Sequence, residues 1–201
     1  MAIKPNREYR NFVIPIETRA AEEDDYRVTG YASTYEPYVL WSHDGVDYIE
    51  RIDPGAFDET DMSDIVFLYN HAGMVYARQK NGTLQVGADA HGLKVDADLS
   101  STEASRQMYE SIRSGLVDQM SFAFTVREDS YDRETHTRTI LKVDKIYDVS
   151  AVSIPANPDT DISAVSARDY FHGVMEAEKA ERLEREKNIA LAKAVYAYKT
   201  I

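Results

Sequence analysis

Short apolar runs separated by polar turn residues dominate the chain from about residue 8 to residue 154. The runs are rich in Val, Ile, Tyr, Phe and Thr, and several alternate apolar and polar residues, as strands with one buried face do. The pattern therefore predicts a mostly β domain. The predicted strands are 9–17, 26–34, 46–52, 65–69, 83–88, 93–99, 118–127 and 138–149.

One segment between these strands has helical periodicity instead. Ser100 and Glu103 form a predicted capping box at its start, and Gly115 is the predicted C-terminal cap. The helix would end a few residues before Ser121. Its apolar positions are Ala104, Met108, Tyr109, Ile112 and Leu116.

The dipeptide Asn81-Gly82, followed by the predicted strand 83–88, is typical of a type I′ hairpin turn. Asn81 and Thr83 also match a glycosylation sequon. Because no secretory signal precedes it, the turn is the preferred interpretation.

The character of the chain changes after Ile154. Residues 155–159 read as a loop, and residues 167–199 are rich in Ala, Glu, Lys and Arg, which predicts a long, largely solvated helix. We therefore expect a domain over residues 1–165 and a charged helical tail over residues 166–201. The tail would either remain solvated or bind a partner or a second copy.

Composition narrows the possible partners. The net charge of -12 argues against nucleic acid or an anionic membrane, because a phosphate-binding surface needs clustered Lys and Arg. The chain has no cysteine, which excludes disulfides, thiolate metal sites and a cysteine nucleophile. The apolar run 12–16 is too short for a signal peptide or a membrane span.

Three side chains are candidates for a hydrolytic site. Ser121 lies in the apolar run 120–124, His71 directly ends the apolar strand 65–69, and Asp148 lies in the later hydrophobic run. A serine becomes a nucleophile when an imidazole accepts its proton, and a carboxylate can orient that imidazole. Taken singly, each residue also has an ordinary structural interpretation. The Gly-x-Ser-x-Gly elbow of α/β-hydrolases is absent.

The other histidines have weaker patterns. His91, His136 and His172 fall in a predicted turn, a polar loop and the tail helix, and are expected to be solvated. His43 lies in a turn signal. A metal-dependent hydrolase using His43, His71 and Asp44 or Asp47 remains an alternative, but the sequence lacks a helical His-Glu-x-x-His or close ligand spacing.

A series of short motifs runs from about Thr29 to Thr160. These are Gly30-Tyr31-Ala32-Ser33, 50–57, Asn70-His71, Gly82-Thr83-Leu84, His91-Gly92-Leu93, Gly115, 120–124, Asp148-Val149-Ser150 and 155–158. In order, spacing and residue type they resemble the prohead protease family of tailed bacteriophages, which is related in fold to herpesvirus maturation proteases. Gln119 and Ala77 stand where that family often has glycine.

The resemblance implies a serine endopeptidase that cleaves capsid or scaffold precursors, and itself, inside proheads in the host cytoplasm or in a bacterium carrying the prophage. His71 and Ser121 would be the catalytic base and nucleophile, and Asp148 the third member, which is a histidine in the herpesvirus relatives. Loop residues Ala156 and Asn157 would provide the oxyanion hole. No cofactor, metal, nucleic acid or membrane is implied, and relatives often dimerise.

The expected fold class is accordingly α+β and mostly antiparallel β. It would have a closed or partly open barrel core, a few flanking helices and the long C-terminal helix. A catalytically inactive assembly or scaffolding protein with the same fold is the alternative function.

Overall fold

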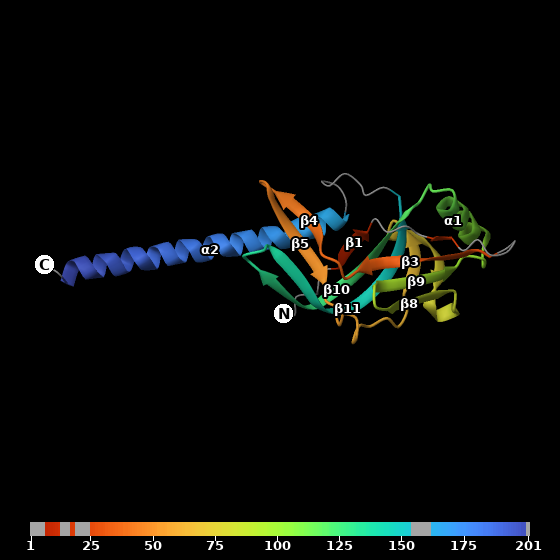
Figure 1. Ribbon diagram of the computed structural model, residues 1–201, viewed down its shortest axis with the longest axis horizontal. Coiled ribbons are helices and arrows are strands. Elements are labelled where there is room, and N and C mark those ends of the chain that lie inside the picture. Colours follow the sequence, from red (N-terminus) through yellow and green to blue (C-terminus); the bar gives the residue numbers. More distant parts are fainter. Residues whose placement is uncertain (1–6, 13–16, 19–24, 154–161, 200–201) are drawn as a thin grey trace.

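The computed structural model describes residues 7–12, 17–18, 25–153 and 162–199 (Figure 1). Within these residues the strands form two sheets, with one short helix beside them and one long helix at the C-terminal end. The predicted α+β class and the long C-terminal helix are thus confirmed. The described strand pairings include no closed barrel.

The larger sheet has the order β1-β10-β11-β5-β4, and β6 pairs with both β11 and β7. Most pairs are antiparallel, but β11 runs parallel to β5 and β6, so the sheet is mixed. Its strands are β1 (Glu8–Phe12), β4 (Tyr38–His43), β5 (Val46–Ile52), β6 (Val66–Tyr69), β7 (Ala72–Arg78), β10 (Gln119–Asp132) and β11 (Thr137–Val152).

The smaller sheet has the order β2-β3-β9-β8 and is antiparallel throughout. β2 follows β1 along the chain but pairs in this second sheet. Strand β3 also contacts β10, so the two sheets share one core. The strands are β2 (Glu17–Thr18), β3 (Arg27–Thr34), β8 (Leu84–Ala88) and β9 (Gly92–Asp98).

The strand predictions were wrong in several places. The predicted strand 9–17 is not one strand, because β1 and β2 pair in different sheets. Strands β4 and β7 were not predicted, because each lies at an edge and most of its side chains are not buried, so the apolar alternation is weak. The hairpin at Asn81-Gly82 was also wrong. Gln79–Asn81 forms a 3₁₀ turn capped by Gly82 at φ 79°, and β7 and β8 pair in different sheets.

The N-cap of helix α1 (Glu103–Arg113) lies two residues later than predicted. The Thr102 hydroxyl, not Ser100, accepts the hydrogen bond from the Ser105 N–H at 3.0 Å. Gly115 does follow the helix in the left-handed conformation, at φ 73°. Leu116 lies beyond the helix and is 74% exposed, so it does not belong to the buried face.

Helix α2 (Ile162–Lys199) extends far beyond the sheets, and only its first part packs on them (Figure 1). Phe171 is fully buried, and its ring lies 4.9 Å from that of Tyr48. Further along, Arg133 of the β10–β11 turn forms an ion pair with Glu181 at 2.6 Å. The helix is therefore docked at its start and solvated towards its end.

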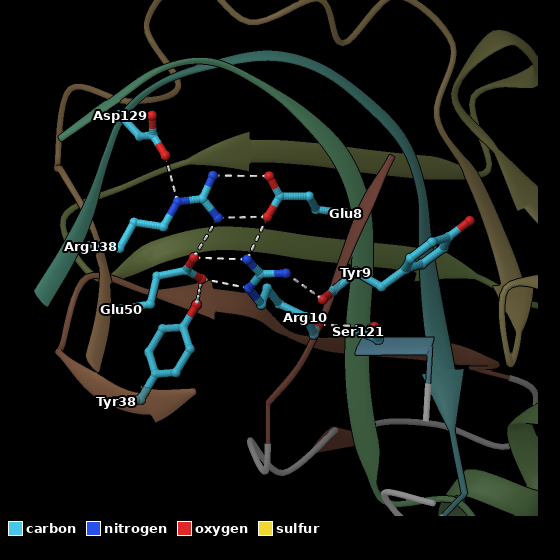
Figure 2. Close-up of polar contacts among 8 residues, drawn as sticks. All are labelled: Glu8, Tyr9, Arg10, Tyr38, Glu50, Ser121, Asp129 and Arg138. Carbon is cyan, nitrogen blue, oxygen red and sulfur yellow. Dashed lines mark hydrogen bonds and ion pairs between the residues drawn. The ribbon is translucent and has the colours of Figure 1, made fainter. Parts of the chain in front are cut away.

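A buried cluster of charges ties β1 to the middle of the larger sheet (Figure 2). Arg10 is 1% exposed and Glu50 is fully buried; the guanidinium of Arg10 donates two hydrogen bonds to the Glu50 carboxylate. Arg138 donates to the same carboxylate at 3.0 Å and to Glu8 at 2.7 Å. Because losing one partner of a buried ion pair costs about 3–5 kcal/mol, this cluster fixes β1 firmly to β5 and β11.

Glu8 makes the free energy of unfolding depend on pH in the acid range. Burial opposes its charge, but Arg10 and Arg138 outweigh burial and lower its pKa from the usual 4.5 to about 2. A carboxylate with a lowered folded-state pKa stabilises the fold above its unfolded pKa, and that stability is lost as the pH falls towards the folded value. Between pH 4.5 and 2, Glu8→Gln is expected to lose less unfolding free energy than the wild type.

Urea unfolding at a series of pH values measures this difference. Glu36→Gln, at an exposed position, is the control and should follow the wild-type curve. If Glu8→Gln also followed that curve, Glu8 would not be the source of the acid sensitivity.

Candidate active site

His71 lies in a two-residue turn between β6 and β7. Asn70 and His71 both have left-handed backbones, at φ 50° and 57°, and Tyr69 pairs with Ala72 across the turn. This is the pattern of a type I′ turn, which usually has glycine at its second position. A histidine there costs about 1–2 kcal/mol. The surrounding structure therefore holds His71 in a strained conformation, as is common at functional sites.

Strand β11 holds this turn in place through main-chain and side-chain contacts. The Asn70 N–H donates to the Ala151 carbonyl oxygen at 3.1 Å, and the His71 N–H donates to the Ser150 hydroxyl at 3.2 Å. Beside the turn, the Tyr69 and Ser153 hydroxyl oxygens lie 2.7 Å apart. The imidazole thus projects from a well-supported position.

Ser121 lies on β10, the strand between β1 and β11. It is fully buried and pairs with Asn11 on one side and Ser150 on the other. Asp148 precedes Ser150 by two residues on β11, so the two side chains share one face of the sheet. Ser121 shares that face, because it pairs with Ser150, while Arg10 pairs with Phe122 and belongs to the opposite face.

The three predicted side chains form one hydrogen-bonded chain. His71 Nδ1 lies 2.6 Å from Asp148 Oδ1, and His71 Nε2 lies 2.6 Å from the Ser121 Oγ. This arrangement suits the tautomer whose Nδ1–H donates to the carboxylate, leaving Nε2 to accept the serine proton. The side chains of His71 and Asp148 are only 8% and 4% exposed, so little water screens their interaction.

The strand β1 covers this group from one side. The Ser121 Oγ lies 2.9 Å from the carbonyl oxygen of Arg10, which is a second acceptor for its single proton (Figure 2). The ring of Tyr9 packs edge-on against the His71 imidazole, at 4.8 Å between centroids. In this structure the hydroxyl therefore has two alternative acceptors, of which only the imidazole can activate it.

The remaining histidines do not join the group. His43 stacks on Trp41 at 5.0 Å, and His172 lies beside the same indole at 5.4 Å. His136 contacts the Tyr131 hydroxyl at 3.1 Å, and the His91 ring lies 6.0 Å from that of Tyr31. Within the described parts of the chain, no group of three or more His, Asp or Glu could hold a metal ion.

Sequence reasoning missed three contributors to this site. Ser150 could have been noticed, because it lies two residues after Asp148 in the same hydrophobic run, directly beyond the predicted strand 138–149. Tyr9 and the Arg10 carbonyl carry no such signal, since only the pairing of β1 with β10 places them here. The predicted oxyanion-hole residues Ala156 and Asn157 lie outside the described residues.

A buried serine, an imidazole and a carboxylate in one hydrogen-bonded chain are the groups with which serine hydrolases carry out acyl transfer. The chain belongs to the caudovirus prohead serine protease family, whose model matches residues 14–175. The family recognised by resemblance is therefore confirmed. No curated protein and no solved structure gave a significant match.

Because the chain belongs to this family, we assign it to the class of prohead serine peptidases. In the described residues, neither helix is both long and apolar enough to cross a membrane.

Proposed function

We propose that this chain is an active endopeptidase that cleaves capsid or scaffold precursors, and itself, during phage head maturation. The proposal places it inside assembling proheads in the host cytoplasm. The observation that carries it is the Asp148–His71–Ser121 chain of hydrogen bonds in a member of this peptidase family.

In the proposed mechanism, the Ser121 Oγ attacks the scissile carbonyl carbon while His71 Nε2 takes the hydroxyl proton. His71 then gives this proton to the leaving amine, and Asp148 stabilises the imidazolium through Nδ1. The product is an acyl-enzyme, which water hydrolyses by the same steps. Main-chain amides of Ala156 and Asn157 are proposed to stabilise the oxyanion, as the family resemblance implies.

The direct test is to incubate the purified chain with its capsid precursor and to map the product termini by mass spectrometry. Labelling of Ser121 by a serine-reactive phosphonate reports activation of the hydroxyl without needing the natural substrate. We expect both defined cleavage products and covalent labelling. A folded protein that gives neither product nor adduct would contradict the proposal.

One observation favours the inactive assembly protein as a second candidate. Ser121 is fully buried, and the Arg10 carbonyl competes with His71 for its proton. A protein that had lost turnover could keep such a covered serine. Labelling separates the two candidates, because a non-catalytic relative would not react at Ser121.

The same family resemblance implied a barrel. The contacts between β3 and β10 support interpreting the two sheets as its partly open form.

We also propose that residues 166–201 act as a tail that binds scaffold, capsid precursor or a second copy of the chain. The helix α2 projects from the body, and Leu183, Ile189 and Leu191 are exposed along it (Figure 1).

Deleting residues 183–201 is expected to leave peptidase activity unchanged and to reduce incorporation into proheads. The cut falls after Phe171 and Glu181, so the docked part of α2 is kept. Deleting residues 167–201 is the comparison, and should lower the thermal midpoint because it also removes the buried Phe171. Quantitative immunoblotting of purified proheads measures incorporation; normal incorporation of the shorter deletion would refute the role of the tail.

A further inference from the structure

Ser150 is a buried hydroxyl at the centre of the site that the three-residue mechanism does not use. It is fully buried on β11, directly opposite Ser121 on β10. Its Oγ donates to Asp148 Oδ1 at 2.9 Å and accepts the His71 main-chain N–H at 3.2 Å. The same Oγ lies 3.2 Å from His71 Nδ1. One side chain therefore contacts the acid, the ring and the backbone of the base.

These contacts use both hydrogen-bonding capacities of a hydroxyl. As a donor, Ser150 binds the same Asp148 oxygen that faces His71 Nδ1, which restricts rotation of the carboxylate. As an acceptor, it satisfies the N–H of a residue held at φ 57°, where the backbone is strained. Aspartate and histidine are thus positioned relative to each other by one shared atom.

We infer that Ser150 is a positioning residue of the proposed peptidase, acting on Ser121 through Asp148 and His71. The inference rests on the proposed function and extends it to a fourth side chain. Catalytic groups need support of this kind because a displacement of about 1 Å can cost about 10²-fold in rate. Ser150 touches no substrate in this role; it sets the orientation of the two groups that do the proton transfer.

The test compares Ser150→Ala with a control serine one residue beyond the end of the same strand. Ser153→Ala removes a hydroxyl that contacts Tyr69 beside the same turn but, in the described contacts, touches neither Asp148 nor His71. We expect Ser150→Ala to lower the maximal rate of phosphonate labelling by about 10- to 100-fold. The half-saturating phosphonate concentration should stay unchanged. Ser150→Thr, which keeps the hydroxyl, should recover most of the rate, and Ser153→Ala should label like the wild type.

A second measurement does not depend on activity. In a Ser121→Ala background, the proton on His71 Nδ1 that is bonded to Asp148 gives a downfield NMR resonance. Adding Ser150→Ala should shift or broaden this resonance, whereas adding Ser153→Ala should not. Ser150→Cys, of similar volume but with a weak donor, repeats the test if the alanine variant does not fold.

The inference is overturned if Ser150→Ala keeps both the labelling rate and the resonance. It is equally overturned if Ser153→Ala loses as much as Ser150→Ala, because the hydroxyl would then serve only the packing of the turn. If wild-type protein is never labelled, the proposed function fails, and the resonance still decides whether Ser150 orients the pair.

Discussion

Replacing Ser121 with alanine is expected to lower kcat for precursor cleavage by about 10⁶-fold, to the level left by binding and oxyanion stabilisation alone. The hydroxyl is the atom proposed to form the acyl-enzyme, and no other serine contacts His71 Nε2 in the described hydrogen bonds. Phosphonate labelling should disappear together with cleavage. Mass spectrometry of the precursor after incubation with the wild type or with Ser121→Ala measures the loss of cleavage.

The fold should survive this change. Alanine removes one oxygen from a fully buried strand position and leaves the pairing of β10 with β1 and β11 intact. The thermal midpoint checks this. Ser130→Ala, at an exposed position on the same strand, is the matched control and should process precursor normally. Normal processing by Ser121→Ala would exclude Ser121 as the nucleophile.

Asp148→Asn is expected to reduce kcat by about 10⁴-fold. Asparagine has nearly the same shape, but it is neutral, and it can present an N–H to His71 Nδ1. The imidazole would then take the other tautomer, with its proton on Nε2, and could no longer accept the proton of Ser121. Loss of the negative charge also removes stabilisation of the imidazolium in a site where water screens little.

Labelling rates and precursor cleavage both measure this effect, and the thermal midpoint shows whether the variant is folded. Asp144→Asn is the control on β11, because its carboxylate contacts Thr125 and Arg127 rather than His71. We expect Asp144→Asn to retain near wild-type kcat. Were Asp148→Asn to keep full activity as well, the third member of the site would have to be sought elsewhere.

The turns at Asn81-Gly82 and Asn70-His71 show what local sequence cannot predict. Asn81-Gly82 has the favoured composition of a type I′ turn, yet the two-residue turn with left-handed backbones lies at Asn70-His71. Composition reports which conformations a dipeptide tolerates. Strand pairing decides which of them forms, and the contacts of β11 with the turn stabilise His71 there against its own preference.

Sequence alone determined the features that depend on neighbouring residues and on recognisable motifs. These were the β-rich region, the buried positions Met108, Tyr109 and Ile112 of α1, the long terminal helix, the family, and the three side chains proposed to act together. His71 could be singled out because it ends an apolar strand, and Ser121 because its run matches the family.

Only the tertiary structure decided what surrounds those side chains. His71 contacts Ser121, which is 50 residues away in the sequence, and Asp148, which is 77 residues away. The Arg10 carbonyl oxygen contacts Ser121 across a separation of 111 residues. Charged side chains are usually exposed, but the sheet buries Arg10, Glu50 and Arg138 together. Such contacts depend on strand order and register, which arise from packing of the whole chain rather than from any local pattern.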